Sequence, residues 1–253
     1  MRYAVMSDVH ANPRALGVAL EDAKGLECGR FVMLGDTTGY GYDAPGALRL
    51  VRKSFNLVLM GNHDSACLGL EPTLETLLNR NYALDVAQRD VLPKTAKLWL
   101  KTRKLVKREG DCAFVHGDFV CPGAWRYVFD DFEAKACFEA CDARVMFCGH
   151  THHAAVWLLS GDGALDRRFV DEFSSPPQAP ETTAFVLPEG SRAVVNVGSV
   201  GYPRNDHCAS YAIYDDETKR ICMRRLPFDF KSYVEDMTSA GISLPFWLSD
   251  IRS

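Results

Sequence analysis

The sequence predicts an α/β fold in which two mixed β-sheets pack face to face and helices flank them. Two patterns carry this prediction. In the first half of the chain, short apolar runs alternate with amphipathic stretches that have the length of helices. In the second half, short apolar runs follow one another with turn residues between them. Of the 253 residues, 47% are hydrophobic, which is enough to fill the core between two sheets.

The apolar runs of the first half have the length of buried strands. Residues 13–24 and 44–55 are amphipathic and lie between the first three runs. Alternating strands and helices are typical of βαβ units, so we expect these strands to be largely parallel. A turn near Gly110 predicts a hairpin over residues 106–117. The runs cover residues 3–6, 30–35, 56–61, 112–117 and 144–149.

The second half of the chain predicts a mainly antiparallel sheet. Its short apolar runs are bounded by turn residues, and the proline-rich segment 174–181 is expected to be an exposed connector. We expect both sheets to belong to one domain that covers residues 1–253. The runs cover residues 154–159, 182–187, 192–198, 209–215 and 219–226.

The segment from about residue 65 to residue 108 is helical in character, and we interpret it as an insertion. It follows directly on "GNHD" (residues 61–64), which makes it the candidate lid or substrate wall. A basic run lies within it, and the predicted hairpin would divide that run between a helix and a strand. A solvated surface is therefore preferred to a guide for a polyanionic substrate. The run consists of Lys94, Lys97, Lys101, Arg103, Lys104, Lys107 and Arg108.

Composition and charge exclude several classes of function. The net charge of −4 argues against nucleic acid as the main partner. No apolar stretch approaches the ~20 residues that span a bilayer, and Asp8 and His10 interrupt the first apolar run before a signal peptide could form. Nine cysteines in no tight framework suit a reducing cytoplasm. We expect a cytoplasmic protein without a membrane partner, and the sequence leaves open whether it is a homo-oligomer.

Side chains of the kinds that bind metals follow all five apolar runs of the first half. The carboxyl ends of parallel strands meet at one edge of a sheet, where open α/β proteins place their sites. Five of the seven histidines lie at these ends, which chance does not explain. The side chains are Asp8 and His10, then Asp36, then Asn62, His63 and Asp64, then His116, and finally His150 and His152.

The chemistry of this set favours divalent transition metals. Carboxylate, imidazole and amide groups together suit manganese first, with iron, zinc, cobalt or nickel as alternatives. Seven ligands drawn from these nine side chains are too many for one ion with an open position, but they suit two ions that share a bridging carboxylate. Gly35, Gly61 and Gly149 precede ligand-bearing segments, where they allow sharp turns and close approach of the backbone.

Several motifs resemble those of the calcineurin-like metallophosphoesterases. They are "SDVHAN", "LGDTTGYG", "GNHD", "VHGD" and "GHTHH", followed by "NVGSVGYPR" at residues 196–204. The resemblance implies a metallophosphoesterase-like α/β sandwich. It also implies one metal held by Asp8, His10 and His152, a second metal held by Asn62, His116 and His150, and Asp36 as the bridge between the two.

The resemblance extends to a bacterial phosphodiesterase-type subgroup rather than to Ser/Thr protein phosphatases. Those phosphatases carry an Asp-Arg pair after the bridging aspartate, where this chain has Gly39 and Tyr40. The histidine of "GNHD" is kept as His63. We expect His63 to donate a proton to the leaving oxygen, with Asp64 or a backbone carbonyl holding its ring.

The resulting hypothesis is a binuclear phosphoesterase that cleaves a small phosphorylated substrate by attack of a metal-bridged hydroxide. A phosphodiester or a nucleotide polyphosphate is the first choice of substrate. A small-molecule phosphomonoesterase comes second and a nuclease third, while a metal-free scaffold of the same fold is the non-enzymatic alternative. Candidate substrate contacts are Asn62, Ser199, Arg204 and Asn12, the last of which is equally well explained as a turn residue before Pro13.

Overall fold

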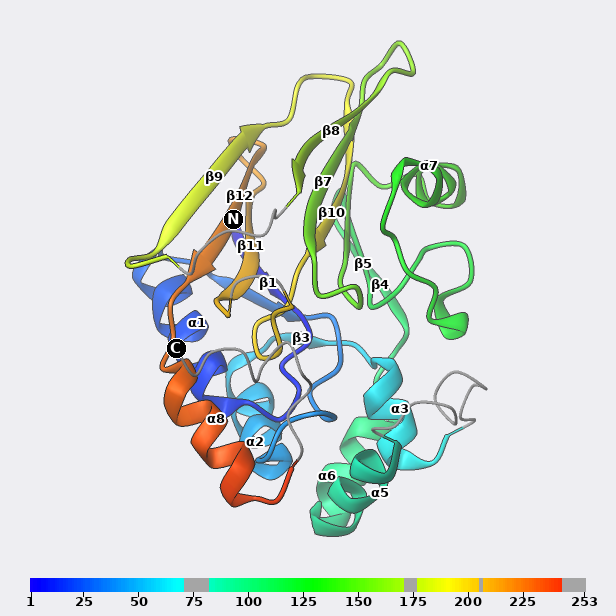
Figure 1. The fold of residues 1–253 in the computed structure, drawn as a ribbon. Coiled ribbons are helices and arrows are strands. Elements are labelled where there is room, and N and C mark those ends of the chain that lie inside the picture. Colours follow the sequence, from blue (N-terminus) through cyan, green and yellow to red (C-terminus); the bar gives the residue numbers. More distant parts are fainter. Residues whose placement is uncertain (71–81, 171–176, 205–206, 243–253) are drawn as a thin grey trace.

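The computed structural model describes residues 1–253 except 71–81, 171–176, 205–206 and 243–253. It contains two six-stranded sheets, which confirms the predicted fold of two packed mixed sheets flanked by helices (Figure 1). The described residues also form seven α-helices.

The first sheet combines a parallel and an antiparallel half. Strands β1, β2 and β3 are parallel, and Val5 of β1 is paired with Val32 of β2. On its other side, β1 pairs antiparallel with β11, and β12 and β9 continue this antiparallel half. The order is β3 (Leu57–Val58), β2 (Arg30–Met33), β1 (Arg2–Met6), β11 (Ala209–Asp215), β12 (Arg220–Leu226) and β9 (Glu181–Val186).

The second sheet is also mixed. Strands β5, β6 and β10 are parallel, whereas β4 and β7 pair antiparallel with their neighbours. The predicted hairpin is confirmed, because β4 and β5 are joined through Gly110, which has a φ of 58°. The order is β4 (Val106–Glu109), β5 (Cys112–Val115), β6 (Val145–Cys148), β10 (Arg192–Val197), β7 (Ala154–Leu159) and β8 (Leu165–Val170).

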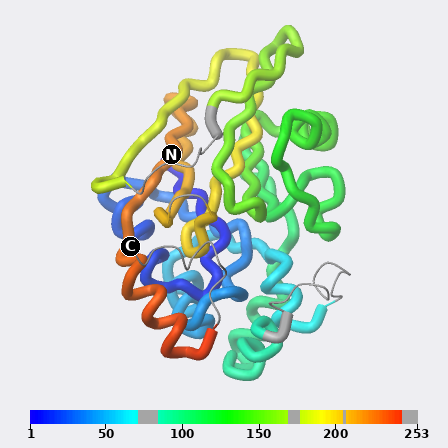
Figure 2. Tube along the Cα trace, viewed as in Figure 1, coloured from blue at the N-terminus to red at the C-terminus, as the bar shows by residue number. Residues whose placement is uncertain are grey.

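The two sheets do not correspond to the two halves of the chain, so that expectation was wrong. Each sheet takes three strands from each half. In Figure 2 the blue first strand runs beside the orange segment that holds β11 and β12. A period-two pattern shows which side chains share a face of a strand, but it does not show which strand lies next to it. Strand β8 was not predicted, because its segment "LDRRFV" is charged.

Alternating side chains divide the core into layers. Tyr3 and Val5 face the space between the sheets, together with Phe114 and Phe147 of the second sheet. Ala4 and Met6 face the opposite way and pack on α1 (Pro13–Gly25) and α2 (Ala44–Ser54). The outer face of the second sheet is covered in the same way by α7 (Asp131–Ala140). Strand β1 is therefore buried on both faces, and its carboxyl end is rigidly held.

The remaining helices include those of the predicted insertion. Helices α3 (Asn62–Leu68), α5 (Tyr82–Val91) and α6 (Lys94–Lys101) lie together beyond the sheets (Figure 1). They agree with the helical character predicted for residues 65–108, of which 71–81 lie outside the described residues. The remaining pieces are α8 (Phe230–Ser239) and a short 3₁₀ turn at Pro122–Ala124. In the part of the chain that the structure describes, no helix combines the length and apolarity needed to cross a bilayer.

Candidate metal centre

The predicted ligands come together where the carboxyl ends of strands from both sheets meet. Asp8 and His10 follow β1, Asp36 follows β2, and His150 and His152 follow β6. All five are at least 95% buried. His116, which is fully buried after β5, and the half-buried Asn62, which begins α3, complete the set of seven.

One group of potential ligands consists of Asp8, His10 and His152. The Nε2 atoms of His10 and His152 lie 3.5 Å and 3.3 Å from Oδ1 of Asp8. The two Nε2 atoms are 3.1 Å from one another. One carboxylate oxygen and two imidazole nitrogens thus converge on one small volume, as a single ion requires.

A second group of potential ligands consists of Asp36, His116 and His150. Nε2 of His116 lies 3.3 Å from Oδ2 of Asp36 and 3.1 Å from Oδ1 of Asn62. The same Oδ2 of Asp36 is 3.7 Å from Nε2 of His10, which belongs to the first group. Asp36 therefore reaches both groups, and it lies closer to His116 than Asp8 does, whose Oδ1 is 4.0 Å from Nε2 of His116.

Backbone carbonyl oxygens orient three of the imidazole rings. Each carbonyl accepts a hydrogen bond from one ring nitrogen, which fixes the ring and leaves the other nitrogen for the ligand group. For His10 and His152 the remaining nitrogen is the Nε2 atom described above. The pairs are Nδ1 of His10 with Thr38 at 3.0 Å, Nδ1 of His152 with Tyr202 at 2.7 Å, and Nε2 of His150 with Trp125 at 2.8 Å.

Burial keeps most of these imidazoles neutral. It lowers the pKa of His10 to about 4 and that of His150 to about 3, and it also lowers the pKa of His152. The pKa of His116 is instead raised, because the attraction of Asp36 and Asp8 outweighs its burial. Neutral imidazole is the form that binds metal, so an ion at this site would compete with the proton of His116.

Two buried carboxylate oxygens make the site suitable for cations. Burial alone would raise the pKa of Asp8 and of Asp36, but the neighbouring histidines hold both below the ordinary value. Oδ1 of Asp8 and Oδ2 of Asp36 have no hydrogen-bond partner among the described residues. Buried anionic oxygens that lack a partner are costly unless a cation meets them. The donor set and these two oxygens therefore fit divalent metal ions.

The backbone at the site is locally strained. Five of the seven predicted ligands have positive φ angles, between 46° and 70°, in a region that residues other than glycine rarely adopt. The predicted close approaches are confirmed at all three glycines, and a Cβ atom on Gly35, which has a φ of 132°, would overlap the backbone of Gly61. A Cβ atom on Gly61 would overlap the carboxylate of Asp36, and one on Gly149 would overlap Ser7 and crowd Asp8.

His63 is held by a residue that the sequence did not single out. Its Nδ1 lies 3.0 Å and 3.1 Å from the two carboxylate oxygens of Asp85, on α5. Burial would lower the pKa of His63, but Asp85 and Asp36 raise it well above the ordinary value. Asp85 lies 22 positions from His63 in a segment without a recognisable motif. Nothing in the local sequence could have identified it.

Asp64 does not hold His63, which corrects that expectation. Oδ1 of Asp64 accepts hydrogen bonds from the backbone N–H and the hydroxyl of Thr38, and Oδ2 accepts one from the N–H of Gly61. At the third position of α3 a carboxylate turns back to the start of its own helix, away from the His63 ring. Asp64 therefore fastens the loop after Asp36 to α3. Burial and the nearby Asp36 raise its pKa to about 6.

Two of the four candidate substrate contacts are occupied by structural bonds. Oδ1 of Asn12 caps α1 by accepting from the N–H of Ala15, and its Nδ2 donates to the carbonyl of Gly201. The hydroxyl of Ser199 donates to the carbonyl of Asp8 and accepts from the N–H of Tyr202. Both side chains are fully buried; Ser199 supports the Asp8 loop, and Asn12 takes the turn role that the sequence offered as the alternative.

Arg204 and a pair of tyrosines border the site. The half-buried Arg204 has a buried Nε without a hydrogen-bond partner among the described residues, and its charge contributes to lowering the pKa of His152. The rings of Tyr40 and Tyr202 are stacked 4.5 Å apart at 12°. The Tyr40 ring centre also lies 4.5 Å from those of His10 and His63. The stacked rings of Tyr40 and Tyr202 thus form a flat aromatic surface beside His63.

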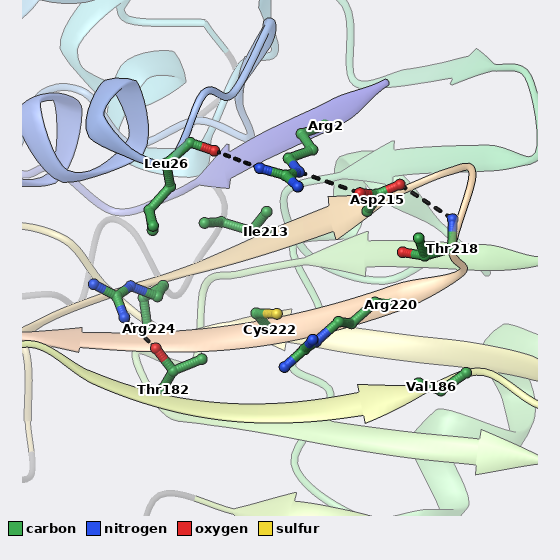
Figure 3. A pocket seen from close by; sticks show the side chains of 10 residues that line it. All are labelled: Arg2, Leu26, Thr182, Val186, Ile213, Asp215, Thr218, Arg220, Cys222 and Arg224. Carbon is green, nitrogen blue, oxygen red and sulfur yellow. Dashed lines mark hydrogen bonds and ion pairs between the residues drawn. The ribbon is translucent and has the colours of Figure 1, made fainter.

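A separate cavity of about 420 Å³ lies on the first sheet and contains none of these residues. Figure 3 shows that two of its three arginines, Arg2 and Arg224, are already paired within the protein. Arg2 donates to the carbonyl of Leu26 and to Asp215, at 3.1 Å and 3.2 Å, and Arg224 donates to Thr182. We therefore assign no ligand to this cavity.

Comparisons with known proteins agree with the site. A family model for the calcineurin-like phosphoesterase superfamily domain matches residues 1–219. The uncharacterized protein MJ0912 of Methanocaldococcus jannaschii is 28% identical over 262 residues, which cover 98% of this chain and 95% of that protein. A crystal structure of a metallophosphoesterase from Sphaerobacter thermophilus is also 28% identical. It superimposes with a TM-score of 0.78 and covers 98% of this chain and 97% of its own.

A more distant structure shows the same fold. The hypothetical protein PH1004 from Pyrococcus horikoshii is 16% identical and has a TM-score of 0.68, with 98% of this chain and 96% of that chain covered. The match of the family model to most of the chain agrees with the grouping of aspartate and histidine at the strand ends. The chain therefore belongs to the calcineurin-like phosphoesterase superfamily and is a metal-dependent phosphoric ester hydrolase.

Proposed function

We propose that this chain is a binuclear enzyme that hydrolyses phosphodiesters or nucleotide polyphosphates. The observation that carries the proposal is the position of Asp36, whose Oδ2 lies 3.3 Å from His116 and 3.7 Å from His10. Those two histidines belong to different ligand groups. A carboxylate shared between two groups is what a pair of ions needs.

The residues divide into two ligand sets around Asp36. Two bound ions would supply Lewis acidity toward the phosphoryl oxygens and would lower the pKa of a water molecule. Mixed imidazole and carboxylate donors suit manganese, and iron, zinc, cobalt or nickel are alternatives. One set is Asp8, His10 and His152, and the other is Asn62, His116 and His150.

His63, Arg204 and Tyr40 act on the substrate. His63, kept protonated beside Asp85 and Asp36, donates its proton to the departing oxygen. Arg204 offers a phosphate oxygen a guanidinium nitrogen, Nε, that has no hydrogen-bond partner within the described part of the chain. The ring of Tyr40 lies against His63 and therefore borders the space into which the leaving group departs.

This arrangement favours a diester or a nucleotide over a small phosphomonoester. A flat ring beside the proton donor can stack on a base or another planar leaving group. The complete ligand set argues against the scaffold alternative, since a scaffold has no use for it.

We also propose a cytoplasmic location and treat residues 1–253 as one domain with the insertion as a wall of the site. All nine cysteines lie among the described residues, no disulfide joins them, and six of them are buried. Free thiols persist where the compartment is reducing.

The proposal is tested with a panel of substrates and a metal titration. After removal of metal and reconstitution with manganese, we expect two ions per chain and turnover of phosphodiesters and dinucleoside polyphosphates above that of p-nitrophenyl phosphate. One ion per chain at saturation would contradict the binuclear site. Preference for the monoester would contradict the substrate class.

A matched pair of histidine variants controls the metal titration. His152→Ala should lose one ion, because Nε2 of His152 belongs to the first ligand group. His153→Ala should keep both ions, because the neighbouring ring lies instead beside Phe129, 6.0 Å away between ring centres. Equal metal content in the two variants would remove His152 from the ligand set.

A further inference from the structure

The ring of His63 is fixed by a side chain of the helical insertion. His63 lies on α3 and Asp85 on α5, and these two helices pack against one another. Nδ1 of His63 lies 3.0 Å from Oδ1 and 3.1 Å from Oδ2 of Asp85. The two residues are 4% and 1% exposed, so water does not compete for this contact. The contact engages Nδ1 and leaves Nε2 as the ring nitrogen that can meet a substrate.

The loop after Asp36 makes room for this ring but cannot orient it. Gly39 has a φ of 90°, and a Cβ atom placed there would lie 2.7 Å from the His63 ring. That distance is shorter than packed carbon atoms allow, so no side chain at position 39 is compatible with the observed ring. The orienting group has to come from another element, and α5 provides it.

A second side chain of α5 fixes the helix to the same loop. Gln88 lies three residues after Asp85, on the same face of the helix. Its Oε1 accepts a hydrogen bond from the N–H of Gly39, and its Nε2 donates one to the carbonyl of Gly41, both at 2.8 Å. Gln88 is 5% exposed. Two neighbouring side chains of one helix thus hold His63 and the loop that packs on it.

We propose that Asp85 is the positioning residue of His63 and that Gln88 fixes the helix that carries it. The proposal rests on the proposed function, in which His63 is the proton donor. In that step an oxygen from water bonds to phosphorus, and the P–O bond to the leaving group breaks with its electron pair on the leaving oxygen. That oxygen takes the proton from Nε2 of His63, and the N–H electron pair stays on nitrogen. Asp85 keeps its hydrogen bond to Nδ1 and takes no proton. The insertion is thereby part of the catalytic apparatus.

The variant Asp85→Asn tests the proposal through the leaving group. Turnover of the manganese-loaded full chain is measured on a p-nitrophenyl phosphodiester and on an alkyl phosphodiester, whose leaving oxygen needs a proton. The loss should be at least ~10-fold larger on the alkyl ester, because general acid catalysis contributes ~10²–10⁴-fold. Equal losses on the two esters would overturn the proposal. Asp90→Asn is the matched control on the same helix, where the side chain is 74% exposed, and it should change neither rate.

Two further variants separate positioning from other roles. The double variant His63→Ala with Asp85→Asn should be no slower than His63→Ala alone, since no ring remains to be positioned. Losses that multiply would show that Asp85 acts independently of His63 and would overturn the proposal. Gln88→Leu removes both hydrogen bonds to the loop and keeps Asp85. Turnover of the alkyl ester should therefore again fall more than turnover of the p-nitrophenyl ester, but by a smaller factor than in Asp85→Asn.

A spectroscopic measurement decides the proposal without reference to activity. In the zinc-loaded, ¹⁵N-histidine-labelled full chain, the Nδ1–H proton signal of His63 is identified by its disappearance in His63→Ala. It should move upfield in Asp85→Asn and stay in place in Asp90→Asn, with unchanged thermal unfolding as the folding control. A signal that does not move would overturn the proposal. If instead His63→Ala loses equal activity on both esters, the proton-donor role in the proposed function fails, while this signal still decides whether Asp85 holds the ring.

Discussion

The strand ends and the helical insertion hold histidines in different ways. At the strand ends, backbone carbonyls accept hydrogen bonds from His10, His150 and His152. In the insertion, the carboxylate of Asp85 holds His63. A carbonyl acceptor carries no net charge, so burial dominates and the pKa values of these three histidines fall. A carboxylate favours the protonated ring, and the pKa of His63 rises.

The difference shows how one residue type performs two tasks a few ångströms apart. The ring centres of His10 and His63 are 5.1 Å apart. Neutral imidazole can bind a metal, whereas protonated imidazole can donate a proton. For His10, His150, His152 and His63, the group on the far nitrogen separates these roles. His116 differs, because Asp36 and Asp8 raise its pKa.

The largest loss of turnover should come from a substitution of Asp36 in the strand-end region. We expect Asp36→Asn to lose at least on the order of 10³-fold in turnover, more than the loss of a single electrostatic donor usually costs. The reason is that its Oδ2 reaches both ligand groups and that an amide supplies less charge there. Metal content and turnover are measured together. A variant that kept two ions and most of its activity would remove Asp36 from the bridging position.

The next largest effect is expected for His63→Ala. Comparing its losses of turnover and metal with those of His10→Ala distinguishes the insertion from the strand ends. His63→Ala should lose ~10²–10⁴-fold on an alkyl or nucleoside ester and far less on a p-nitrophenyl ester, with both metals retained. His10→Ala should lose activity on both esters together with metal, because its Nε2 belongs to a ligand group. Parallel kinetics and elemental analysis check this contrast. Loss of metal from His63→Ala would assign His63 to the ligands instead.

The sequence predicted the strand-end region far better than the insertion. Asp8, Asp36 and His150 each follow a recognisable apolar run, so that local pattern and parallel pairing together placed them at one site. Asp85 and Gln88 lie on an ordinary amphipathic helix, and their partners are set only by how that helix packs. Tertiary contacts of this kind leave no trace in the local sequence.

The same limit explains why the sequence left two roles open for Asn12 and could not show what the hydroxyl of Ser199 contacts. Each lies within a motif, and a motif does not show whether a polar side chain faces a ligand or the backbone. In the structure, backbone groups occupy the polar atoms of both side chains. The partition of strands between the sheets was also unpredictable, since the alternation of buried residues is compatible with several neighbours.

A moderate effect is expected at Tyr40, whose ring touches both regions. Its centre lies 4.5 Å from those of His10 and His63. Tyr40→Ala should raise the KM for a nucleoside ester by roughly 2–10-fold, which corresponds to the ~0.5–1.5 kcal/mol typical of aromatic pairs. An alkyl ester should be affected less. Tyr40→Phe keeps the ring and is the matched control, and an equal KM change for both esters would remove the stacking role.

The smallest effect should come from the outer face of the insertion. The basic run is divided between α6 and β4, as the sequence predicted, and Lys101 is exposed at the end of α6. We expect Lys101→Ala to change turnover of a small phosphodiester by less than about twofold, because salt screens the interactions of a solvent-exposed charge. Loss beyond tenfold, about 1.4 kcal/mol of transition-state binding, would place the run in the site.

Lys97 belongs to the same basic run as Lys101, but its side chain bonds to the protein instead of pointing only to solvent. Its Nζ donates to the carbonyl of Arg89 at 3.1 Å, so it joins α6 to the end of the helix that carries Asp85. Lys97→Ala should lower the free energy of unfolding by about 1 kcal/mol, the usual net value of one hydrogen bond, with little change in turnover. Thermal unfolding and kinetics of Lys97→Ala and Lys101→Ala, measured side by side, check this. If Lys101→Ala were the less stable of the two, the inward bond of Lys97 would not be what distinguishes them.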